Sequence, residues 1–416
     1  MRAEIITIGD ELLIGQVINT NQAFIAEKLN SVGIAVARMT TVGDDEEMML
    51  KAFKNAYRTY DVVCVTGGLG PTHDDITKKV ICKFFQTDLI MDQGILENIK
   101  AILGRRNIPL LKASEEQAMV PGGCTVFPNS MGSAPGILFD RDGKFFIAMP
   151  GVPFEMKSIM EESVVPYFRT HASGHVILHH TLKTTGIAES VLASRLGNVE
   201  EFLDGATLAF LPSPQGTRLR ITVNEPSVPA AEKKIQEVEQ QIRAKVDKYI
   251  YATGEEDLEE IVGHILKERK MTIAVAESCT GGMIADRLTN VPGSSEYLER
   301  GVVTYSNASK IELLGVPSEL IIRHGAVSRE VALAMAEGIR KTAKTTIGIS
   351  TTGIAGPSGG TPEKPVGLVW IGYADTESSF ALQFNFGNNR MRTKERASQA
   401  ALELVRRKIL SIALEQ

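Results

Sequence analysis

Several features that mark common protein classes are scarce in this chain of 416 residues. Its four cysteines, Cys64, Cys82, Cys124 and Cys279, show no CxxC spacing, which argues against a zinc site or disulfide framework and favours a reducing, cytoplasmic location. No apolar run reaches the ~18 residues that span a bilayer, and the N-terminus lacks a signal-peptide pattern. The net charge is −5 without any dense Lys/Arg block, so we expect neither membrane nor nucleic-acid partners.

The first 170 residues alternate patterns typical of strands and helices. Strands are predicted at 5–8, 34–40 and 62–65, and helices at 21–29 and 46–57. This order predicts a doubly wound α/β domain, in which ligands bind beyond the carboxyl ends of the strands. The loops 9–20 and 66–78, rich in glycine and polar residues, lie at those ends.

The rest of the chain divides in two by its pattern. Residues 171–252 predict a small α+β module, with strands at 175–182, 207–211 and 218–223 and helices at 188–196 and 230–246. Residues 253–416 predict a second α/β unit, with strands at 272–276, 302–305, 346–350, 366–373 and 380–386 and helices at 283–288, 329–341 and from 393. Asp257 is expected to cap a helix after a linker. The predicted fold class is α/β: two three-layer α/β domains, 1–170 and 253–416, joined by the α+β middle module 171–252.

The segment Ala276-Glu277-Ser278-Cys279-Thr280-Gly281-Gly282 joins a strand pattern to a helical one. Such a turn presents Ser278 at the carboxyl end of the strand, beside the free N–H groups of a helix. A serine nucleophile needs a base, and Lys310 or Tyr305 could serve. The alternative, that Ser278 only caps the helix, does not explain the second glycine-rich segment at 353–360. Cys279 is expected to be a buried apolar residue, because neighbours at a strand end point to opposite sides.

The N-terminal loops carry carboxylates next to glycines. Asp10 and Glu11 follow the first strand, and a glycine-rich stretch at 66–72 precedes Asp74 and Asp75. Glycines that allow close backbone approach, followed by paired carboxylates, suit a phosphorylated ligand with a divalent ion. A simple turn with one aspartate as helix cap is the alternative, and it leaves Asp10 and Glu11 unexplained. His73 is expected to be a loop residue.

Four C-terminal motifs resemble those of the nicotinamide mononucleotide deamidase domain: Ala-Glu-Ser-Cys-Thr-Gly-Gly at 276–282, Val-Thr-Tyr-Ser-Asn at 303–307, His-Gly-Ala-Val-Ser at 324–328 and Gly-Ile-Ala-Gly-Pro at 353–357. The resemblance covers residues 255–416. It implies hydrolysis of the nicotinamide carboxamide with release of ammonia and without a cofactor, in which Ser278 attacks while Lys310 and Tyr305 relay the proton. The implied substrate-binding residues are Glu277, Thr280, Gly281, Gly282, Thr352, Gly353, Gly356 and, for the phosphate, Arg390.

The N-terminal half is similar to the molybdopterin-binding fold of molybdenum-cofactor biosynthesis proteins. It is closest to the version fused to the deamidase in the competence- and damage-inducible CinA family. The matching motifs are Gly-Asp-Glu-Leu-Leu at 9–13, Asn-Thr-Asn at 19–21, Thr-Gly-Gly-Leu-Gly-Pro-Thr at 66–72 and Met-Pro-Gly-Val-Pro at 149–153. The resemblance implies metal-dependent ADP-ribose pyrophosphatase activity with Mg²⁺ or a similar ion, Asp74 and Asp75 serving as metal or base groups. The implied substrate-binding residues are Asp10, Glu11, Asn19, Asn21, Gly67, Gly68, Thr72, Lys78 and Glu155.

The middle module resembles the KH-type insert of the same family. It lacks the GxxG loop and basic face with which KH domains hold RNA, so no RNA partner is expected. The leading hypothesis is a bifunctional, homodimeric hydrolase of pyridine-nucleotide recycling, acting on nicotinamide mononucleotide and on ADP-ribose. The alternative is a pterin- or nucleotide-binding module with a regulatory or competence-linked scaffolding role and no catalysis, which predicts no ammonia release.

Overall fold

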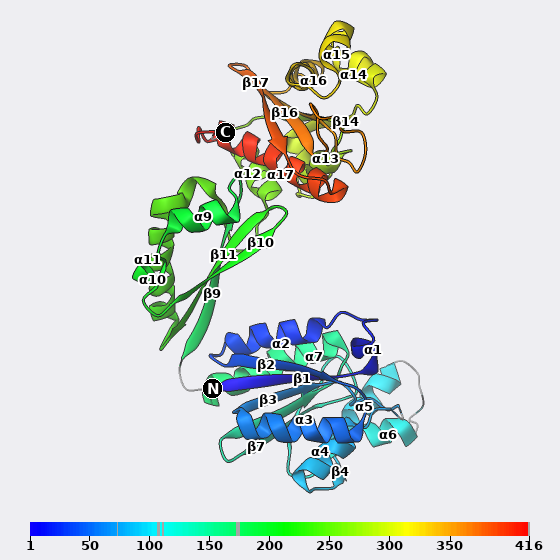
Figure 1. Cartoon of the computed structure of the whole chain (residues 1–416). Coiled ribbons are helices and arrows are strands. Elements are labelled where there is room, and N and C mark those ends of the chain that lie inside the picture. Colours follow the sequence, from blue (N-terminus) through cyan, green and yellow to red (C-terminus); the bar gives the residue numbers. More distant parts are fainter. Residues whose placement is uncertain (73, 106–108, 110–111, 172–174, 415–416) are drawn as a thin grey trace. The chain divides into compact units, whose positions relative to one another are not determined.

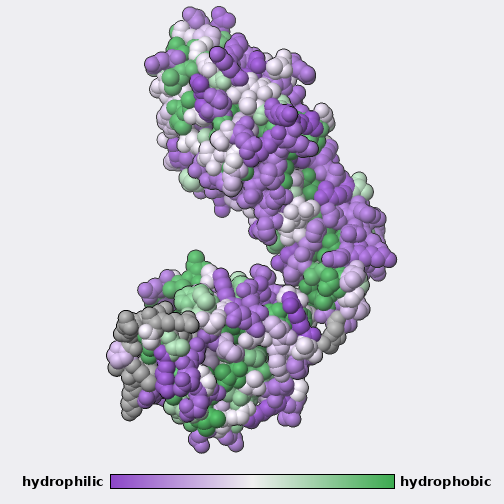
Figure 2. All heavy atoms as spheres, turned by 180° about the vertical axis from the view of Figure 1, so that it is seen from behind, coloured by the Kyte–Doolittle hydropathy of each residue, from purple (hydrophilic) through white to green (hydrophobic). Residues whose placement is uncertain are grey.

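The computed structural model describes residues 1–72, 74–105, 109, 112–171 and 175–414 (Figure 1). The chain divides into two compact units, Met1–Leu178 with Thr222–Ile235 and His179–Ile221 with Gln236–Gln416. His73 lies outside the described residues. Among those that are described, no helix combines the length and apolar character needed to cross a membrane. Hydrophilic residues predominate on the face shown in Figure 2, where apolar residues form scattered patches.

The N-terminal domain alternates strands and helices, as the sequence predicts. Its strands are β1 Arg2–Ile8, β2 Ala35–Val42, β3 Val62–Thr66, β4 Leu89–Met91, β5 Met119–Pro121, β6 Thr125–Phe127, β7 Gly136–Arg141 and β8 Lys144–Met149. Its helices are α1 Asp10–Leu13, α2 Thr20–Asn30, α3 Glu46–Thr59, α4 Thr77–Phe85, α5 Gln93–Arg105, α6 Lys112–Gln117, α7 Pro153–Ile159 and α8 Val165–His171, with a π-helical turn, Met160–Val164, between the last two.

The main N-terminal sheet has the strand order β2-β1-β3-β8-β7-β6. The first four strands are parallel, and β7 and β6 run antiparallel to their neighbours. Alternate strand residues face opposite helical layers: Ile5 packs with Leu29 of α2, whereas Ile6 packs with Phe53 of α3. A sheet covered on both faces buries its central strands completely, which explains the continuous apolar run of β3.

The middle module is a four-stranded sheet with the order β10-β11-β9-β12 and helices packed on it. Its strands are β9 Val176–Thr184, β10 Thr207–Ser213, β11 Gly216–Glu225 and β12 Ile250–Thr253. Its helices are α9 Glu189–Leu196, α10 Glu200–Leu203, α11 Val228–Val246 and the 3₁₀ turn Asp247–Tyr249. The burial of β11 alternates along its length, which is the pattern of a sheet with one face on a core.

The C-terminal domain has a sheet with the order β14-β13-β15-β16-β17. Its strands are β13 Ile273–Glu277, β14 Leu298–Val303, β15 Ile347–Gly353, β16 Leu368–Ala374 and β17 Ser379–Asn385. Its helices are α12 Leu258–Glu268, α13 Met283–Thr289, α14 Asn307–Leu314, α15 Ser318–His324, α16 Arg329–Ala343 and α17 Arg390–Ile409, with a 3₁₀ turn at Ser294–Glu296.

Two helical layers sandwich this sheet as well. Val275 of β13 faces the core shared with α12 and α17, and its neighbour Ala274 faces the core shared with α16. The three-layer architecture predicted for both α/β domains is therefore confirmed. Asp257 caps α12 in a capping box with Glu260, as predicted.

One strand boundary was wrong. The sequence analysis placed a strand at 302–305, whereas β14 begins at Leu298 and ends at Val303. The reason is that β14 is an edge strand whose first half, including Glu299 and Arg300, is exposed and polar. Tyr305 therefore lies in the loop between β14 and α14, at the same sheet edge as Ser278.

Candidate functional sites

Ser278 lies at the carboxyl end of β13, where the sequence places it. Its backbone N–H donates to the carbonyl oxygen of Thr351 at 3.0 Å, which ties it to the next strand, β15. The chain then turns through Gly281 and Gly282, whose φ angles of 64° and 94° favour glycine, and enters α13. Ser278 is nearly buried, with 9% of its surface exposed.

Lys310 brings a buried amine to this hydroxyl. It lies in the first half of α14 and is 1% exposed. Its Nζ lies 3.2 Å from Ser278 Oγ and 2.7 Å from the carbonyl oxygen of Thr304. Burial lowers the pKa of the Lys310 amine, because removing water disfavours the charged form. A lysine with a lowered pKa is better able to hold a neutral, proton-accepting amine beside a serine.

Tyr305 and Arg390 meet at the rim of the same region. Arg390, at the start of α17, donates to the Tyr305 hydroxyl at 3.0 Å and to the carbonyl oxygen of Gly356 at 2.9 Å. The structure thus brings together the three segments that the sequence analysis selected. Tyr305 contacts the Lys310 amine through its backbone carbonyl, at 3.4 Å, whereas its hydroxyl faces Arg390. A proton-relay role for the phenol stays a prediction.

Other predicted residues have structural partners. Both carboxylate oxygens of Glu277 accept backbone N–H groups, from Gly282 at 3.0 Å and Ala285 at 2.9 Å, so this side chain holds the turn into α13. The Thr280 hydroxyl bonds that of Thr351 at 2.7 Å. Thr352 donates to the carbonyl oxygen of Ala326 at 2.7 Å. Their direct contact with substrate stays a prediction.

The glycine-rich segment after β15 packs tightly against its neighbours. A Cβ on Gly353 would lie 2.6 Å from the carbonyl oxygen of Leu368, and Gly356 has a φ of 84°. These two positions therefore need glycine for local packing and conformation, whatever they contact in addition.

Cys279 is buried next to the serine. Burial raises the pKa of its thiol to about 12, with the nearby Glu277 carboxylate adding to the rise. A thiol that stays protonated is a poor nucleophile. The interpretation of Cys279 as a buried apolar residue is consistent with this environment.

Lys394 is a residue that the sequence analysis missed. A Cβ on Gly281 would lie 3.5 Å from the Lys394 Nζ, so this amine lies over the turn that follows Ser278. Lys394 is four residues after Arg390 on α17, and this spacing places both cations on one face of the helix. The i, i+4 spacing in the basic stretch was the signal that could have identified it.

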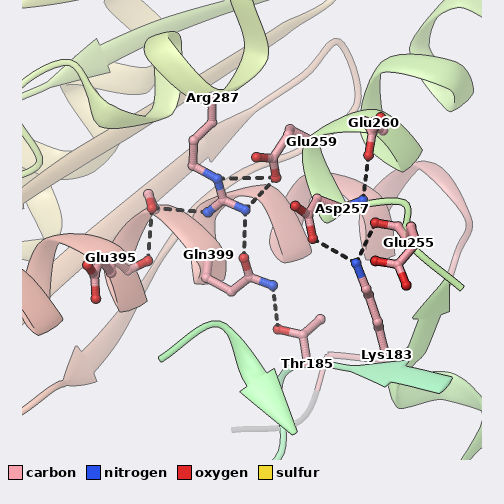
Figure 3. A network of polar contacts seen from close by, with 10 residues as sticks. Lys183, Thr185, Glu255, Asp257, Glu259, Glu260, Arg287, Glu395 and Gln399 are labelled. Atoms are coloured by element: carbon pink, nitrogen blue, oxygen red, sulfur yellow. Dashed lines mark hydrogen bonds and ion pairs between the residues drawn. The ribbon is translucent and has the colours of Figure 1, made fainter. Parts of the chain in front are cut away.

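A buried polar network holds the elements behind the serine turn (Figure 3). Arg287 of α13 donates to Glu259 of α12 at 2.6 Å and to Gln399 of α17 at 2.7 Å. Gln399 in turn donates to the Thr185 hydroxyl at 3.2 Å, just after β9 of the middle module. The network therefore fixes α13, which begins directly after the serine turn, against α12 and α17.

The predicted N-terminal loops line a hollow of about 400 Å³, which we call the carboxylate cavity. Its acidic lining residues are Glu11, Asp44, Asp74, Asp75 and Glu155. Gly67 and Gly68 form its floor after β3, at φ angles of 118° and 65°. A Cβ on Gly67 would lie 2.2 Å from the carbonyl oxygen of Ile8, so only glycine fits there. The cavity lies at the carboxyl ends of β1 and β3, as the fold predicts.

The carboxylates of this cavity influence one another. Burial raises the pKa of Asp44, and the charges of Asp10, Glu11 and Asp74 raise it further. Asp44 was absent from the sequence prediction because it follows β2, whose loop carries no glycine-rich motif. Asp75 accepts from the Thr72 N–H at 2.9 Å and from the Thr72 hydroxyl, so the exposed Thr72 helps to fix this carboxylate.

The donor set fits a divalent ion that also takes ligand oxygens. Asp74 and Asp75 both line the cavity, and mutual repulsion among the acidic groups would be relieved by a cation. Within the described parts of the chain, no three His, Cys, Asp or Glu side chains form a ready-made metal site. A divalent ion held by Asp74 and Asp75 stays a prediction.

The remaining predicted residues surround this cavity. Lys78 is buried, its Nζ donates to the carbonyl oxygen of Gln117 at 2.9 Å, and burial lowers its pKa to about 8, against the attraction of Asp75. Glu155 accepts from Asn129 at 2.6 Å, and burial raises its pKa. Asp10 accepts from the Asp44 N–H at 3.3 Å and is outside the cavity lining.

Asn19 and Asn21 line a second hollow of about 280 Å³, the asparagine cavity, which shares Glu11 and Gly151 with the first. Asn19 caps α2 through the Gln22 N–H and donates to the Thr7 hydroxyl at 2.9 Å. Asn21 donates to the carbonyl oxygen of Gly151 at 2.8 Å, and its Oδ1 is buried without a partner in the structure.

Three protein families match successive parts of the chain. Residues 4–170 match the family described as "Probable molybdopterin binding domain", residues 179–252 match "Damage-inducible protein CinA KH domain", and residues 255–409 match "CinA C-terminal domain". The chain is therefore similar, in order, to all three parts that the sequence analysis distinguished.

Full-length relatives agree with these matches. A "CinA-like protein" from Chloroherpeton thalassium is 48% identical over 98% of this chain and 99% of its own length. A second "CinA-like protein", from Gemmatimonas aurantiaca, is 44% identical over 98% of this chain and 96% of its own length. Among solved structures, the competence/damage inducible protein CihA from Agrobacterium tumefaciens is 38% identical, covering 36% of this chain and 94% of that protein with a TM-score of 0.35.

Proposed function

Since the chain belongs to the CinA family, we propose that its C-terminal domain hydrolyses the carboxamide of nicotinamide mononucleotide to the carboxylate and ammonia. The observation that carries this proposal is the buried amine of Lys310, 3.2 Å from the Ser278 hydroxyl. Amide hydrolysis requires a nucleophile and a group that moves its proton, and this pair offers both.

The first half of the reaction forms an ester. Neutral Lys310 accepts the Ser278 proton while Oγ attacks the carboxamide carbon, and the carbonyl oxygen becomes an oxyanion. The lysine ammonium then gives its proton to the departing nitrogen, so that the C–N bond breaks and ammonia leaves.

The second half returns the enzyme to its starting state. Lys310, neutral again, accepts a proton from water as the water oxygen attacks the ester carbon. The C–O bond to Ser278 breaks, the serine recovers a proton from the lysine, and nicotinate mononucleotide is released. Arg390 is placed at the rim, beside the Tyr305 hydroxyl, where a cation suits the substrate phosphate.

A second function is favoured by the carboxylate cavity. We infer that the N-terminal domain hydrolyses the diphosphate of ADP-ribose, with a divalent ion held by Asp74 and Asp75. The ion would supply charge neutralisation for the diphosphate oxygens. Glu155, whose pKa is raised by burial, lies in the same lining and is suited to take a proton from the attacking water.

Assays of the purified full-length protein against each substrate, with and without chelator, test both functions. Ammonia release from nicotinamide mononucleotide should persist in chelator, and cleavage of ADP-ribose to AMP and ribose 5-phosphate should stop. Absence of ammonia release would overturn the amidase proposal and favour a pterin- or nucleotide-binding scaffold. ADP-ribose cleavage that survives chelator would overturn the metal-dependent mechanism.

A further inference from the structure

A polar cavity of about 270 Å³ lies within the second compact unit, and its lining shares no residue with either proposed reaction site. Its walls come from the end of β9, the hairpin between β10 and β11, the strand β12 and the segment that leads into α12. We call it the junction cavity and define it by the lining residues on which the argument depends: Lys183, Gln215, Arg218, Tyr251, Glu255 and Asp257.

Close contacts fix the walls of the junction cavity. The Nζ of the buried Lys183 donates to the carbonyl oxygen of Glu255 at 2.6 Å and to the Asp257 carboxylate at 3.0 Å, which ties the segment before α12 to β9 (Figure 3). A Cβ on Gly216 would lie 1.9 Å from the carbonyl oxygen of Thr184, so the hairpin approaches β9 as closely as only glycine allows. A cavity with fixed walls loses little conformational freedom when it binds a ligand.

Two opposite charges in this lining have no protein partner. Lys183 and Asp257 neutralise each other in an ion pair. The residues that the structure describes give neither a hydrogen bond nor an ion pair to the Arg218 guanidinium or to the Glu255 carboxylate. A ligand carboxylate suits the guanidinium fork, and a ligand ammonium group suits the carboxylate. Because these two charges sum to zero, the lining favours a ligand that carries both signs over a simple anion or cation.

The size and the neutral polar groups of the junction cavity narrow the ligand class further. Its volume of about 270 Å³ lies at the lower end of the range found for ligand pockets, so it suits a molecule of amino-acid size and is too small for a dinucleotide. The Gln215 amide and the Tyr251 hydroxyl also line it, and neither has a hydrogen-bond partner in the part of the chain that the structure describes. A ligand with a primary amide can exchange two hydrogen bonds with the amide of Gln215.

We propose that the junction cavity binds a zwitterionic small molecule of the α-amino acid class, whose carboxylate contacts Arg218 and whose ammonium group contacts Glu255. An amide side chain on that ligand would meet Gln215, so L-glutamine is the probe that matches the lining in all three groups. The proposal does not depend on the two hydrolytic functions given above, because the junction cavity shares no residue with their sites.

Calorimetry on the full-length protein tests the proposal with three probes that differ by one charged group. L-glutamine carries both charges, glutaramic acid lacks the ammonium group, and 4-aminobutanamide lacks the carboxylate. We expect L-glutamine to bind at least ~10-fold more tightly than either of the other two, because each of those leaves one charge of the lining unpaired.

Two variants show which charge of the ligand each residue recognises. In Arg218→Met, L-glutamine should bind no more tightly than 4-aminobutanamide, and in Glu255→Gln it should bind no more tightly than glutaramic acid. The matched controls are Arg220→Met, on the same strand β11, and Glu256→Gln, both exposed residues outside the lining. Both controls should bind L-glutamine as the wild type does, and an unchanged melting temperature shows that all four variants are folded.

Three results would overturn the proposal. The first is a wild-type protein that binds no L-glutamine at ~10 mM, a concentration that would fill most of a millimolar site. The second is binding of glutaramic acid, 4-aminobutanamide or inorganic phosphate as tightly as L-glutamine, which would show that the cavity does not require both charges. The third is an equal loss of all three probes in Arg218→Met and Glu255→Gln, which would give these residues a structural role only.

Discussion

The amine of Lys310 points at the hydroxyl of Ser278 from a different secondary-structure element, with 3.2 Å between the two heavy atoms. The helix α14 supplies the lysine, and the end of β13 supplies the serine. The backbone carbonyls of Thr304 and Tyr305 fix the amine by accepting from it. A buried amine held in this way is positioned before substrate arrives, which reduces the reorganisation needed for proton transfer.

Replacing Ser278 should abolish deamidation alone. Ser278→Ala removes the attacking oxygen, and we expect ammonia release to fall by on the order of 10³-fold or more. ADP-ribose cleavage by the same preparation serves as the internal control and should stay unchanged. Retained deamidation would transfer the attack to another group, such as water.

The lysine should determine the acid side of the pH profile. Burial lowers the pKa of Lys310, so the neutral amine becomes available at a lower pH than for an exposed lysine. The kcat/KM for deamidation should therefore be low where the amine is protonated and should rise as the pH increases through this lowered pKa. The rise should be centred below the ordinary lysine value of about 10.4.

Two substitutions isolate this base. Lys310→Met should cost ~10²–10⁴-fold in kcat, as expected for a lost general base. Lys310→Arg keeps a positive charge but cannot become neutral, so it should not restore activity. Activity in Lys310→Arg close to the wild-type level would show that the position needs charge and not a proton acceptor.

Cys279 should be chemically inert in the folded protein. Its thiol pKa of about 12 leaves almost no thiolate near neutral pH, and the side chain is 6% exposed. Iodoacetamide at pH 8 should label it at least ~10²-fold more slowly than the same residue in urea. Cys279→Ala should keep the kcat for deamidation. Loss of activity in that variant with an unchanged melting temperature would give the thiol a chemical role.

The sequence predicted several central strands well but missed the hairpin that completes the N-terminal sheet. Central strands such as β3 and β13 are continuous apolar runs because helices cover both faces, so their pattern is unambiguous. The hairpin between β7 and β8 was missed, although Asp142-Gly143 is a strong turn signal, and both residues adopt positive φ.

The candidate sites show the same limit. Motifs identified Ser278, Lys310 and the N-terminal carboxylates, since these lie in loops with distinctive residues. Asp44 contributes to the carboxylate cavity through tertiary contacts alone, and nothing in its local sequence differs from an ordinary loop. Which residues line a cavity depends on which strands become neighbours in the sheet, and a single sequence does not reveal this.

The ion pair between Arg287 and Glu259 should matter for stability. Both side chains are almost buried, at 10% and 15% exposure, so Arg287→Met leaves an uncompensated carboxylate and should cost ~3–5 kcal/mol. The single tryptophan, Trp370, lies in β16 and reports unfolding of this domain in urea by its fluorescence. Lys267→Met, which removes the more exposed pair with Glu296, should cost less than ~1 kcal/mol.

A double variant separates charge from packing in that network. If the cost of Arg287→Met comes from the unpaired carboxylate, Arg287→Met with Glu259→Gln should recover part of the lost stability. Equal destabilisation of the single and double variants would assign the effect to lost packing of the arginine side chain.

Binding of Mg²⁺ in the carboxylate cavity should depend on Asp75. Asp75→Asn removes one negative charge from the lining while keeping its size, so the Mg²⁺ concentration for half-maximal ADP-ribose cleavage should rise ~10–100-fold. The matched control is Asp142→Asn, an exposed aspartate in the β7–β8 turn at a φ of 54° that asparagine also tolerates. Deamidation should be unchanged in both variants, because Ser278 and Lys310 belong to another domain. An unaltered Mg²⁺ dependence in Asp75→Asn would remove this carboxylate from the metal site, and loss of both activities would indicate misfolding instead.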